Sequence, residues 1–177
     1  PVINDEGDVV GLAGGRRFDA TTSFFLPLQR PLHALRCLQK GEPIRRGTIQ
    51  VQWILEPFDQ CRKLGLSPHW EMAVRQTTPE QNMLVAKTVL PEGPADGKVQ
   101  HGDILIQVNN ETLTSFIRLD EILDSSVEQD VDLFILRGGK EIRVRVSIQS
   151  LDSITPSRFV TVAGGTFHDL SYQKARY

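Results

Sequence analysis

Cysteine is scarce in this sequence, which contains only Cys37 and Cys61 among its 177 residues. Two thiols are too few for the disulfide framework that stabilises small secreted proteins. Both fall on helical patterns, which predicts buried thiols in a reducing compartment. The sequence also lacks the His and Cys spacing of zinc sites, so we expect neither a metal nor another cofactor.

Long runs of one residue class are missing as well. The formal net charge is −2, and Arg16-Arg17 and Arg45-Arg46 are only pairs. A near-neutral charge favours neither nucleic acid nor a membrane surface as a partner. No apolar run is long enough to cross a bilayer. The start, Pro1–Glu6, has no methionine, basic region or apolar region, which predicts the interior of a longer chain and not a signal peptide.

A nucleophile elbow is the third absence. No Ser-x-Gly sequence accompanies the four histidines, which are His33, His69, His101 and His168. Without such a serine we expect solvated or helix-capping histidines and no catalytic residue in this chain.

The most informative stretch begins at Gly93-Pro94-Ala95 and continues after six residues with Gly102-Asp103. Both segments predict turns, because glycine tolerates positive φ and proline fixes its own φ. The strand that follows has one apolar face, made by Ile104, Ile106 and Val108. An ordinary surface turn before a strand is the alternative interpretation.

Residues 1–30 predict three short strands, with Gly14-Gly15 in the loop before Thr21–Leu26. Three short strands cannot bury enough apolar surface to fold alone, so this segment needs partner strands. Pro31–Lys40 then predicts a helix that ends at Gly41, inside a linker of residues 31–44.

Residues 45–150 predict one domain of mainly β structure with helices, an α+β fold. Strands are expected at Ile49–Leu55, Met83–Leu90, Ile104–Val108, Val131–Leu136 and Ile142–Ile148. Helices are expected at Pro57–Leu64, Pro68–Gln76 and Phe116–Leu123. Together they predict a small, partly open barrel with a helix beside a sheet edge.

Residues 151–177 contain an apparent repeat. Gly165–His168 followed by Ser171–Tyr177 echoes Gly47–Gln50 followed by the Pro57–Leu64 helix. The echo predicts the truncated start of a second, similar unit, and chance similarity is the alternative.

The run G-P-A … G-D-I-L-x-x-V-N, from Gly93 to Asn109, resembles the PDZ domains of HtrA-type serine proteases. PDZ domains bind protein C-termini or extended peptides by adding a strand to their own sheet edge. Ser23–Leu32 and Thr166–Gln173 are similar to a fungal, nuclear, pro-apoptotic branch of that family. The resemblance implies the last strands of a trypsin-like barrel, a linker helix, a PDZ domain and the start of a second one, in a nuclear protein.

The resemblance also implies where the protease machinery lies. In that family a Ser-Gly-(Gly/Ser)-Pro motif carries the nucleophile, and Pro1 matches its last residue. The His, Asp and Ser triad would then precede this chain. The walls of the primary specificity pocket would be Ala13, Gly14 and Gly15 on one side and Thr22 and Phe24 on the other. Such uncharged walls favour cleavage after apolar residues, and a plain hairpin turn is the alternative for the glycines.

In the PDZ region the resemblance implies a carboxylate-binding loop at Gly47-Thr48-Ile49-Gln50, with Val51 opening the binding strand. Gln50 replaces the usual second glycine, which predicts weak binding of free C-termini or a preference for internal segments. Arg45-Arg46 beside the loop would assist by charge or remain solvated. The apolar pocket for the last ligand side chain is expected at Ile49, Val51 and Ile122.

These features predict a fragment of an HtrA-type serine endopeptidase that carries its peptide-binding module. Its partners would be protein or peptide substrates and C-termini, and a homo-oligomer is an open option. The alternatives are a non-enzymatic PDZ adaptor and a degenerate protease repeat kept for assembly.

Overall fold

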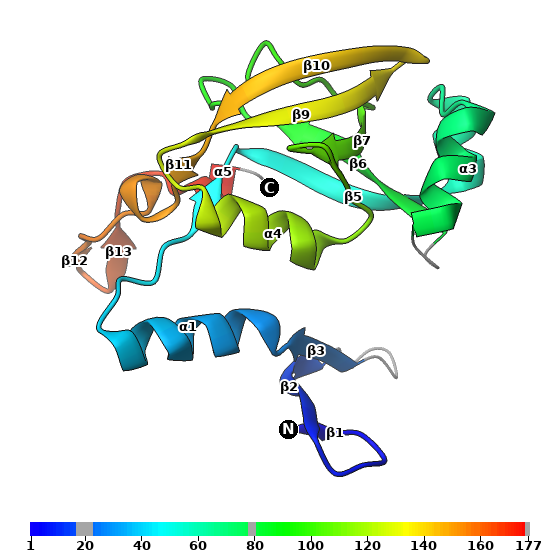
Figure 1. The fold of residues 1–177 in the computed structure, drawn as a ribbon. Helices are drawn as coiled ribbons and strands as arrows, with labels where there is room; N and C mark the ends of the chain where they lie inside the picture. Colours follow the sequence, from blue (N-terminus) through cyan, green and yellow to red (C-terminus); the bar gives the residue numbers. More distant parts are fainter. Residues whose placement is uncertain (17–22, 78–80, 176–177) are drawn as a thin grey trace. The chain divides into compact units, whose positions relative to one another are not determined.

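The computed structural model describes residues 1–16, 23–77 and 81–175. It divides into two compact units, Pro1–Ile44 and Arg45–Tyr177, which are described separately below (Figure 1). Among the described residues, no helix is long and apolar enough to cross a membrane.

The first unit is an antiparallel sheet in the order β1-β2-β3, followed by a helix. Its elements are β1 (Val2–Ile3), β2 (Val9–Arg16), β3 (Ser23–Pro27) and α1 (Gln29–Lys40). The predicted helix is confirmed, and it ends at Gly41, whose φ of 69° is left-handed.

Strand β2 corrects the prediction that Gly14 and Gly15 belong to a loop. The strand continues through both glycines, and its pairing with β3 shifts by a bulge between Ala13 and Gly15. A bulge adds one residue to a strand, and glycine inside a strand often marks such a bulge. A Cβ on Gly14 would lie 3.5 Å from the carbonyl oxygen of Phe24 on β3, an ordinary van der Waals distance, so the space there would also admit a small side chain.

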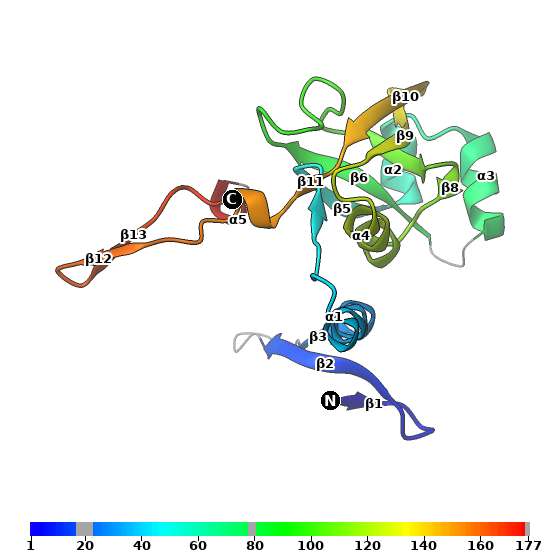
Figure 2. The same cartoon turned by 60° about the vertical axis from the view of Figure 1, so that its left-hand side comes forward.

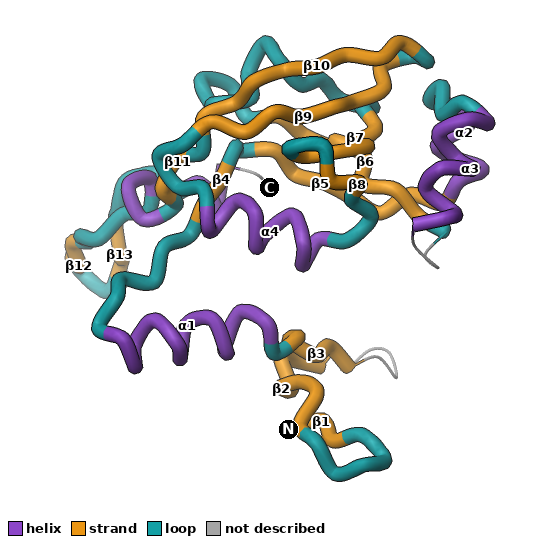
Figure 3. The backbone as a smooth tube through the Cα atoms, viewed as in Figure 1, coloured by secondary structure: helices purple, strands orange, loops and turns teal. Residues whose placement is uncertain are grey.

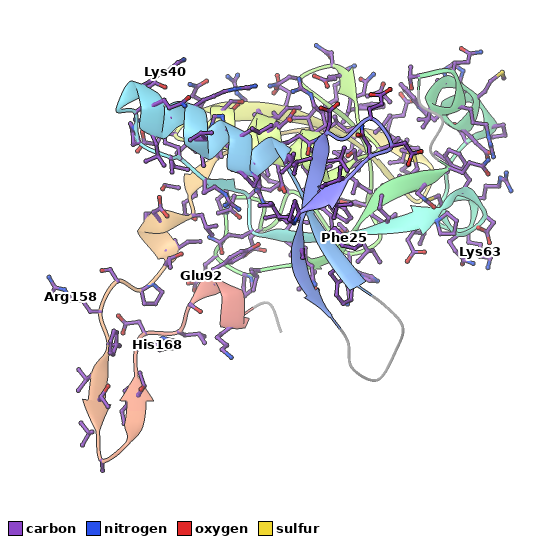
Figure 4. All side chains as sticks on the ribbon, turned by 90° about the horizontal axis from the view of Figure 1, so that it is seen from below. Phe25, Lys40, Lys63, Glu92, Arg158 and His168 are labelled. Atoms are coloured by element: carbon purple, nitrogen blue, oxygen red, sulfur yellow. The ribbon has the colours of Figure 1, made fainter. Side chains whose placement is uncertain are left out.

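The first unit leaves many large apolar side chains in solvent. The exposed fraction is 45% for Val9, 52% for Phe24 and 57% for Phe25, a side chain that Figure 4 labels. Phe24 and Phe25 are neighbours on β3 and point to opposite faces, so this sheet exposes apolar side chains on both faces. The sequence expectation that these strands need partner strands is consistent with this exposure.

The second unit is built on an antiparallel sheet with the strand order β10-β9-β7-β6-β5, to which β8 adds by pairing with β7 (Figure 3). The strands are β5 (Val51–Pro57), β6 (Asn82–Val89), β7 (Ile104–Val108), β8 (Glu111–Thr112), β9 (Asp130–Arg137) and β10 (Lys140–Ser147). A separate two-stranded ladder joins β4 (Gly47–Thr48) to β11 (Gln149–Ser150).

This sheet is covered on both faces. Leu84 and Leu105 belong to a core shared with α4 (Phe116–Ser125), whereas Met83 and Ile104 belong to a core shared with α2 (Phe58–Lys63) and α3 (Pro68–Thr77). Neighbouring residues of a strand point to opposite faces, so the two cores lie on opposite sides of the sheet. Figure 2 shows α4 end-on beside β5 and away from α3. Double burial explains the continuous apolar runs of β6 and β7.

The Gly-Asp turn before β7 is held by a buried ion pair. Asp103 is fully buried and accepts hydrogen bonds from Arg137 Nε at 2.8 Å and Arg137 Nη2 at 2.7 Å. Asp103 also accepts from the backbone N–H of Gln100, and Arg137 donates to the carbonyl of Lys98. The turn is therefore bonded directly to the end of β9.

A second charged cluster joins α2 to α3. Glu71 on α3 accepts hydrogen bonds from Arg62 at 2.7 Å and from Arg75 at 2.9 Å. The Arg75 guanidinium also lies over the Phe58 ring, 4.4 Å from its centroid. The hydrogen bonds from Arg62, and next those from Arg75, outweigh burial and lower the pKa of Glu71 to about 2.

The chain beyond the sheet contains a short 3₁₀ helix (Asp152–Ile154), a hairpin of β12 (Val160–Val162) with β13 (Gly165–Phe167), and α5 (Tyr172–Ala175). A strand before a helix agrees with the predicted echo. The pairing differs, because β13 pairs with the strand just before it, whereas β4 pairs with the distant β11. Figure 4 labels Arg158 and His168, which flank this hairpin in sequence and line a hollow of about 330 Å³.

The exposure of the first unit generates a prediction for amide hydrogen exchange. In a strictly monomeric sample, amides of Ile104–Val108 and Leu133–Leu136 should exchange slowly, because β7 and β9 are buried strands inside the sheet. Amides of Val9–Leu12 should exchange fast, because few buried contacts oppose local opening of that sheet. Similar protection in both regions would contradict this account.

The buried ion pair predicts a large effect of Asp103→Ala. The substitution leaves the Arg137 guanidinium without its carboxylate, so the free energy of unfolding should fall by about 3 kcal/mol. Glu111→Ala is the matched control, since Glu111 pairs with Arg118 at 2.6 Å but both side chains are more than 40% exposed. The control should cost less than about 1 kcal/mol. Urea unfolding measures both values, and equal losses would refute the assignment.

The low pKa of Glu71 predicts a pH-dependent contribution to stability. Its folded pKa of about 2 lies below the ordinary value of 4.5, so the stabilisation is present above that value and is lost as pH falls toward 2. The wild type should therefore exceed Glu71→Gln in unfolding midpoint at neutral pH, and the difference should shrink below about pH 4.5. Glu121→Gln, which changes an exposed carboxylate, serves as the control. A difference that stays constant down to pH 2.5 would be incompatible with this origin.

Candidate functional site

The predicted carboxylate-binding loop lies between two strands and not inside one. The sequence predicts a strand over Ile49–Leu55, but the structure ends β4 at Thr48 and starts β5 at Val51. The break occurs because Gln50 has a φ of 58°, which is left-handed backbone that cannot continue a strand. Such a conformation costs a side-chain-bearing residue about 1 kcal/mol, whereas glycine adopts it freely. The structure thus retains the glycine conformation at a position that glycine does not occupy.

The Gln50 side chain and backbone are both engaged. Its Nε2 donates to Oε1 of Gln149 on β11 at 2.6 Å, and its carbonyl accepts from the backbone N–H of Leu90 at 3.1 Å. Its own N–H donates to the hydroxyl oxygen of Thr48 at 3.0 Å. The residue is therefore a fixed part of the loop.

The start of the loop is pressed against the end of α4. A Cβ on Gly47 would lie 2.0 Å from the carbonyl oxygen of Leu123, so only glycine fits at this position. The Gly47 N–H donates to Oδ1 of Asp124 at 2.9 Å. Asp124 is 8% exposed, and its carboxylate fills the space in front of this backbone donor.

Both arginines beside the loop pair with carboxylates of the same chain. Arg46 Nε lies 3.6 Å from Asp124 Oδ2, and Arg45 Nη1 lies 3.6 Å from Glu128 Oε2. The Arg45 pair is exposed, whereas Asp124 is buried. The positive charge that the sequence offers near the loop is balanced internally.

The predicted pocket residues come together in the structure. Ile49, Val51 and Ile122 all belong to the core cluster that joins β5 to α4, and each is less than 9% exposed. Trp53 of β5 lies in the same cluster, and its buried indole N–H has no hydrogen-bond partner among the described residues. An apolar layer therefore underlies the strand on which a peptide is expected.

The sequence reasoning missed Asp124, although a signal exists. Asp124 falls in the last turn of the Phe116–Ser125 helix, where the helix dipole disfavours negative charge. An acid at that place needs a compensating partner, and the structure supplies the Gly47 N–H and Arg46. The partners are far away in sequence, so the pattern alone does not reveal them.

In the first unit, four of the five proposed pocket-wall residues are described. Ala13, Gly14 and Gly15 lie on β2 and Phe24 lies on the paired strand β3, with Gly15 opposite Phe24. All four are exposed, and Thr22 lies outside the described residues. The bulge excludes the plain-turn alternative for Gly14 and Gly15, since both belong to the strand.

One histidine contacts a cysteine, since His33 Nε2 lies 3.6 Å from the Cys37 Sγ one turn further along α1. His33 lies on α1 and His69 on α3, while His101 and His168 each contact a backbone carbonyl through Nδ1. In the described ranges, no three His, Cys, Asp or Glu side chains cluster to hold a metal. Both cysteines are buried, as predicted, and burial first of all raises the pKa of the Cys61 thiol to about 11.

Comparison with protein families gives two matches to this chain. A family model described as a PDZ domain matches residues 85–137, which run from within β6 to the end of β9. A second model, described as a PDZ-like domain, matches residues 153–177. The second match falls in the region where the sequence predicts the start of another PDZ-like unit.

Curated fungal proteins are similar along nearly the whole chain. The pro-apoptotic serine protease nma111 of Aspergillus clavatus is 61% identical over 178 residues, which cover 99% of this chain and 17% of that protein. The protein NMA111 of Coccidioides immitis is 62% identical with the same coverage. The chain thus spans 17% of the length of these relatives.

Among solved structures, the HtrA-type protease AlgW with a decapeptide matches with a TM-score of 0.54 and 17% identity. The match covers 81% of this chain and 42% of that chain, and at this identity it concerns the fold. The fungal relatives and the PDZ matches show that the chain is a PDZ-containing segment of the HtrA family of serine proteases, and the AlgW match shows a similar fold.

Proposed function

We propose that this chain supplies the peptide-binding module of an HtrA-type serine endopeptidase and that the module captures extended protein segments along β5. The proposal rests on the observation that the outer edge of β5 is unpaired in the described part of the chain. Strand β5 ends the sheet order, and within the described residues no strand pairs with its outer edge. The unpaired N–H and C=O groups of such an edge are a template for an added strand.

The two edges of the sheet differ in charge. Strand β10, at the opposite edge, carries Lys140, Arg143 and Arg145, which are the kind of residue that blocks edge-to-edge pairing. Strand β5 carries no basic residue, and its only charged residue is Glu56. The contrast supports β5 as the edge that is kept available for a ligand.

The apolar layer beneath β5 supports an apolar ligand. Val51 and Trp53 of the strand pack with Leu119 and Ile122 of α4 in one buried cluster. Main-chain pairing would supply most of the affinity, and side-chain contacts near this layer would supply the selectivity.

The first unit extends the proposal to cleavage by the parent protein. The uncharged, exposed residues Ala13, Gly14, Gly15 and Phe24 would wall a specificity pocket for apolar side chains. Identity of 61% along 99% of the chain to a protein named a serine protease supports this reading over a free-standing adaptor. We also propose a nuclear location, which rests on the family resemblance.

A homo-oligomer is a further part of the proposal, because pairing between copies of the chain would cover the exposed apolar side chains of the first unit.

Titration with an apolar ten-residue peptide tests the proposed site. Amide chemical shifts of Val51–Leu55 should move, with a dissociation constant of about 10–100 μM, because strand addition offers few side-chain anchors. Amides of Lys140–Ser147 provide the internal control, since that basic edge should not respond. Shifts that avoid Val51–Leu55, or that are equal at both edges, would refute the proposed site.

A further inference from the structure

The ligand class follows from the state of the loop at the head of β5. A free C-terminal carboxylate binds a PDZ-type loop through backbone N–H groups that point at it. In this chain two of the loop N–H groups already have internal acceptors. Gly47 N–H donates to the Asp124 carboxylate at 2.9 Å, and Gln50 N–H donates to the Thr48 hydroxyl at 3.0 Å.

The negative charge of Asp124 beside the loop also disfavours a terminal carboxylate as ligand. The Asp124 carboxylate is buried beside Gly47, and Arg46 lies 3.6 Å from it. A second carboxylate brought to this place would face a like charge, which is unfavourable in a partly desolvated site. Arg45 pairs with Glu128 at 3.6 Å and is directed to that partner.

The Gln50 side chain also occupies the space that a glycine at this position would leave open. Gln50 holds the left-handed backbone with its side chain bonded to Gln149 at 2.6 Å. A Cβ on Gly93, in the Gly-Pro turn, would lie 2.9 Å from the Gln50 Cβ, so the turn packs directly on this residue. The head of β5 is therefore filled by the protein itself.

From this arrangement we infer that β5 takes internal extended segments of proteins, whose chain continues past the loop, and that it makes little use of a terminal carboxylate. The inference rests on the proposed function of the β5 edge. Asp124 acts as a built-in carboxylate that occupies the place of a peptide terminus. An internal segment needs mainly the strand edge, with whose outer side no described strand pairs.

Three versions of one apolar decapeptide test the inference on the 177-residue chain. The first has a free C-terminus, the second a C-terminal amide, and the third is flanked at both ends by polar residues. We expect dissociation constants for the first two within about twofold of each other, and the flanked peptide to bind at least as tightly, since most contacts are main-chain pairs.

The possible outcomes distinguish the proposed function of the β5 edge from the preference for internal segments. Binding of the free-carboxylate peptide that is tenfold or more tighter than binding of the amide would overturn the inference and leave the proposed function intact. Loss of binding on flanking would overturn it in the same way. Failure of all three peptides to shift Val51–Leu55 would overturn the proposed function and the inference together.

Substitution of the built-in carboxylate gives an independent test. Asp124→Asn removes the charge, so the free-carboxylate peptide should gain about fivefold over the amide, which is about 1 kcal/mol. Asp120→Asn, one helical turn earlier, is the matched control and should leave the ratio unchanged. Gln50→Gly, which restores the glycine, should shift the ratio in the same direction as Asp124→Asn. An unchanged ratio in both folded variants would overturn the inference, and the wild-type comparison decides the matter if neither folds.

Discussion

The contact between Gly47 and the end of α4 is the constraint on which the site depends. The position where a Cβ would stand lies 2.0 Å from the carbonyl oxygen of Leu123, so the loop and the helix meet through backbone. The hydrogen bond from Gly47 to Asp124 fixes the same contact. One close approach thus sets α4 beside the head of β5 and, at the same time, places a carboxylate in the loop. The same close approach therefore pairs the Gly47 N–H with a carboxylate of the same chain, which is the basis of the proposed preference for internal segments.

The two units differ in how much of their apolar surface is buried. The sheet of the second unit is covered on one face by α4 and on the other by α2 and α3, and its turn at Asp103 is bonded to Arg137. The sheet of the first unit exposes Phe24 and Phe25 by more than half. Among the described residues of the first unit, Cys37 is the one buried hydrophobic side chain, so its three strands and one helix bury little apolar surface. This difference accords with a segment that spans 17% of its fungal relatives.

Sequence patterns were sufficient to predict the elements that depend on residues close together in the sequence. The Gly-Asp turn, the alternation in β7 and the apolar stripe of α4 predicted the sheet, the helix beside it and the PDZ resemblance, and the mainly β, α+β fold is confirmed. The stop at Gly41 is confirmed for the same reason. These features depend on the conformational preferences of single residues and on periodicity.

Features that depend on contacts between residues far apart in the sequence could not be predicted from sequence patterns. Gln50 carries no pattern that announces a left-handed backbone, because its conformation is fixed by the loop around it. Asp124 gained its role only when folding brought Gly47 to the end of its helix. Gly14 and Gly15 favoured a loop by composition, but pairing with β3 drew them into a bulged strand.

The central claim is that a peptide lies along β5 and continues past the loop. Intermolecular nuclear Overhauser effects between the isotope-labelled chain and an unlabelled peptide with polar flanks on both sides test it most directly. The account predicts contacts from Val51–Leu55 to consecutive peptide residues, with peptide residues present beyond both ends of the paired stretch. Contacts confined to Gly47–Gln50 and to the last residue of a peptide with a free C-terminus would contradict it.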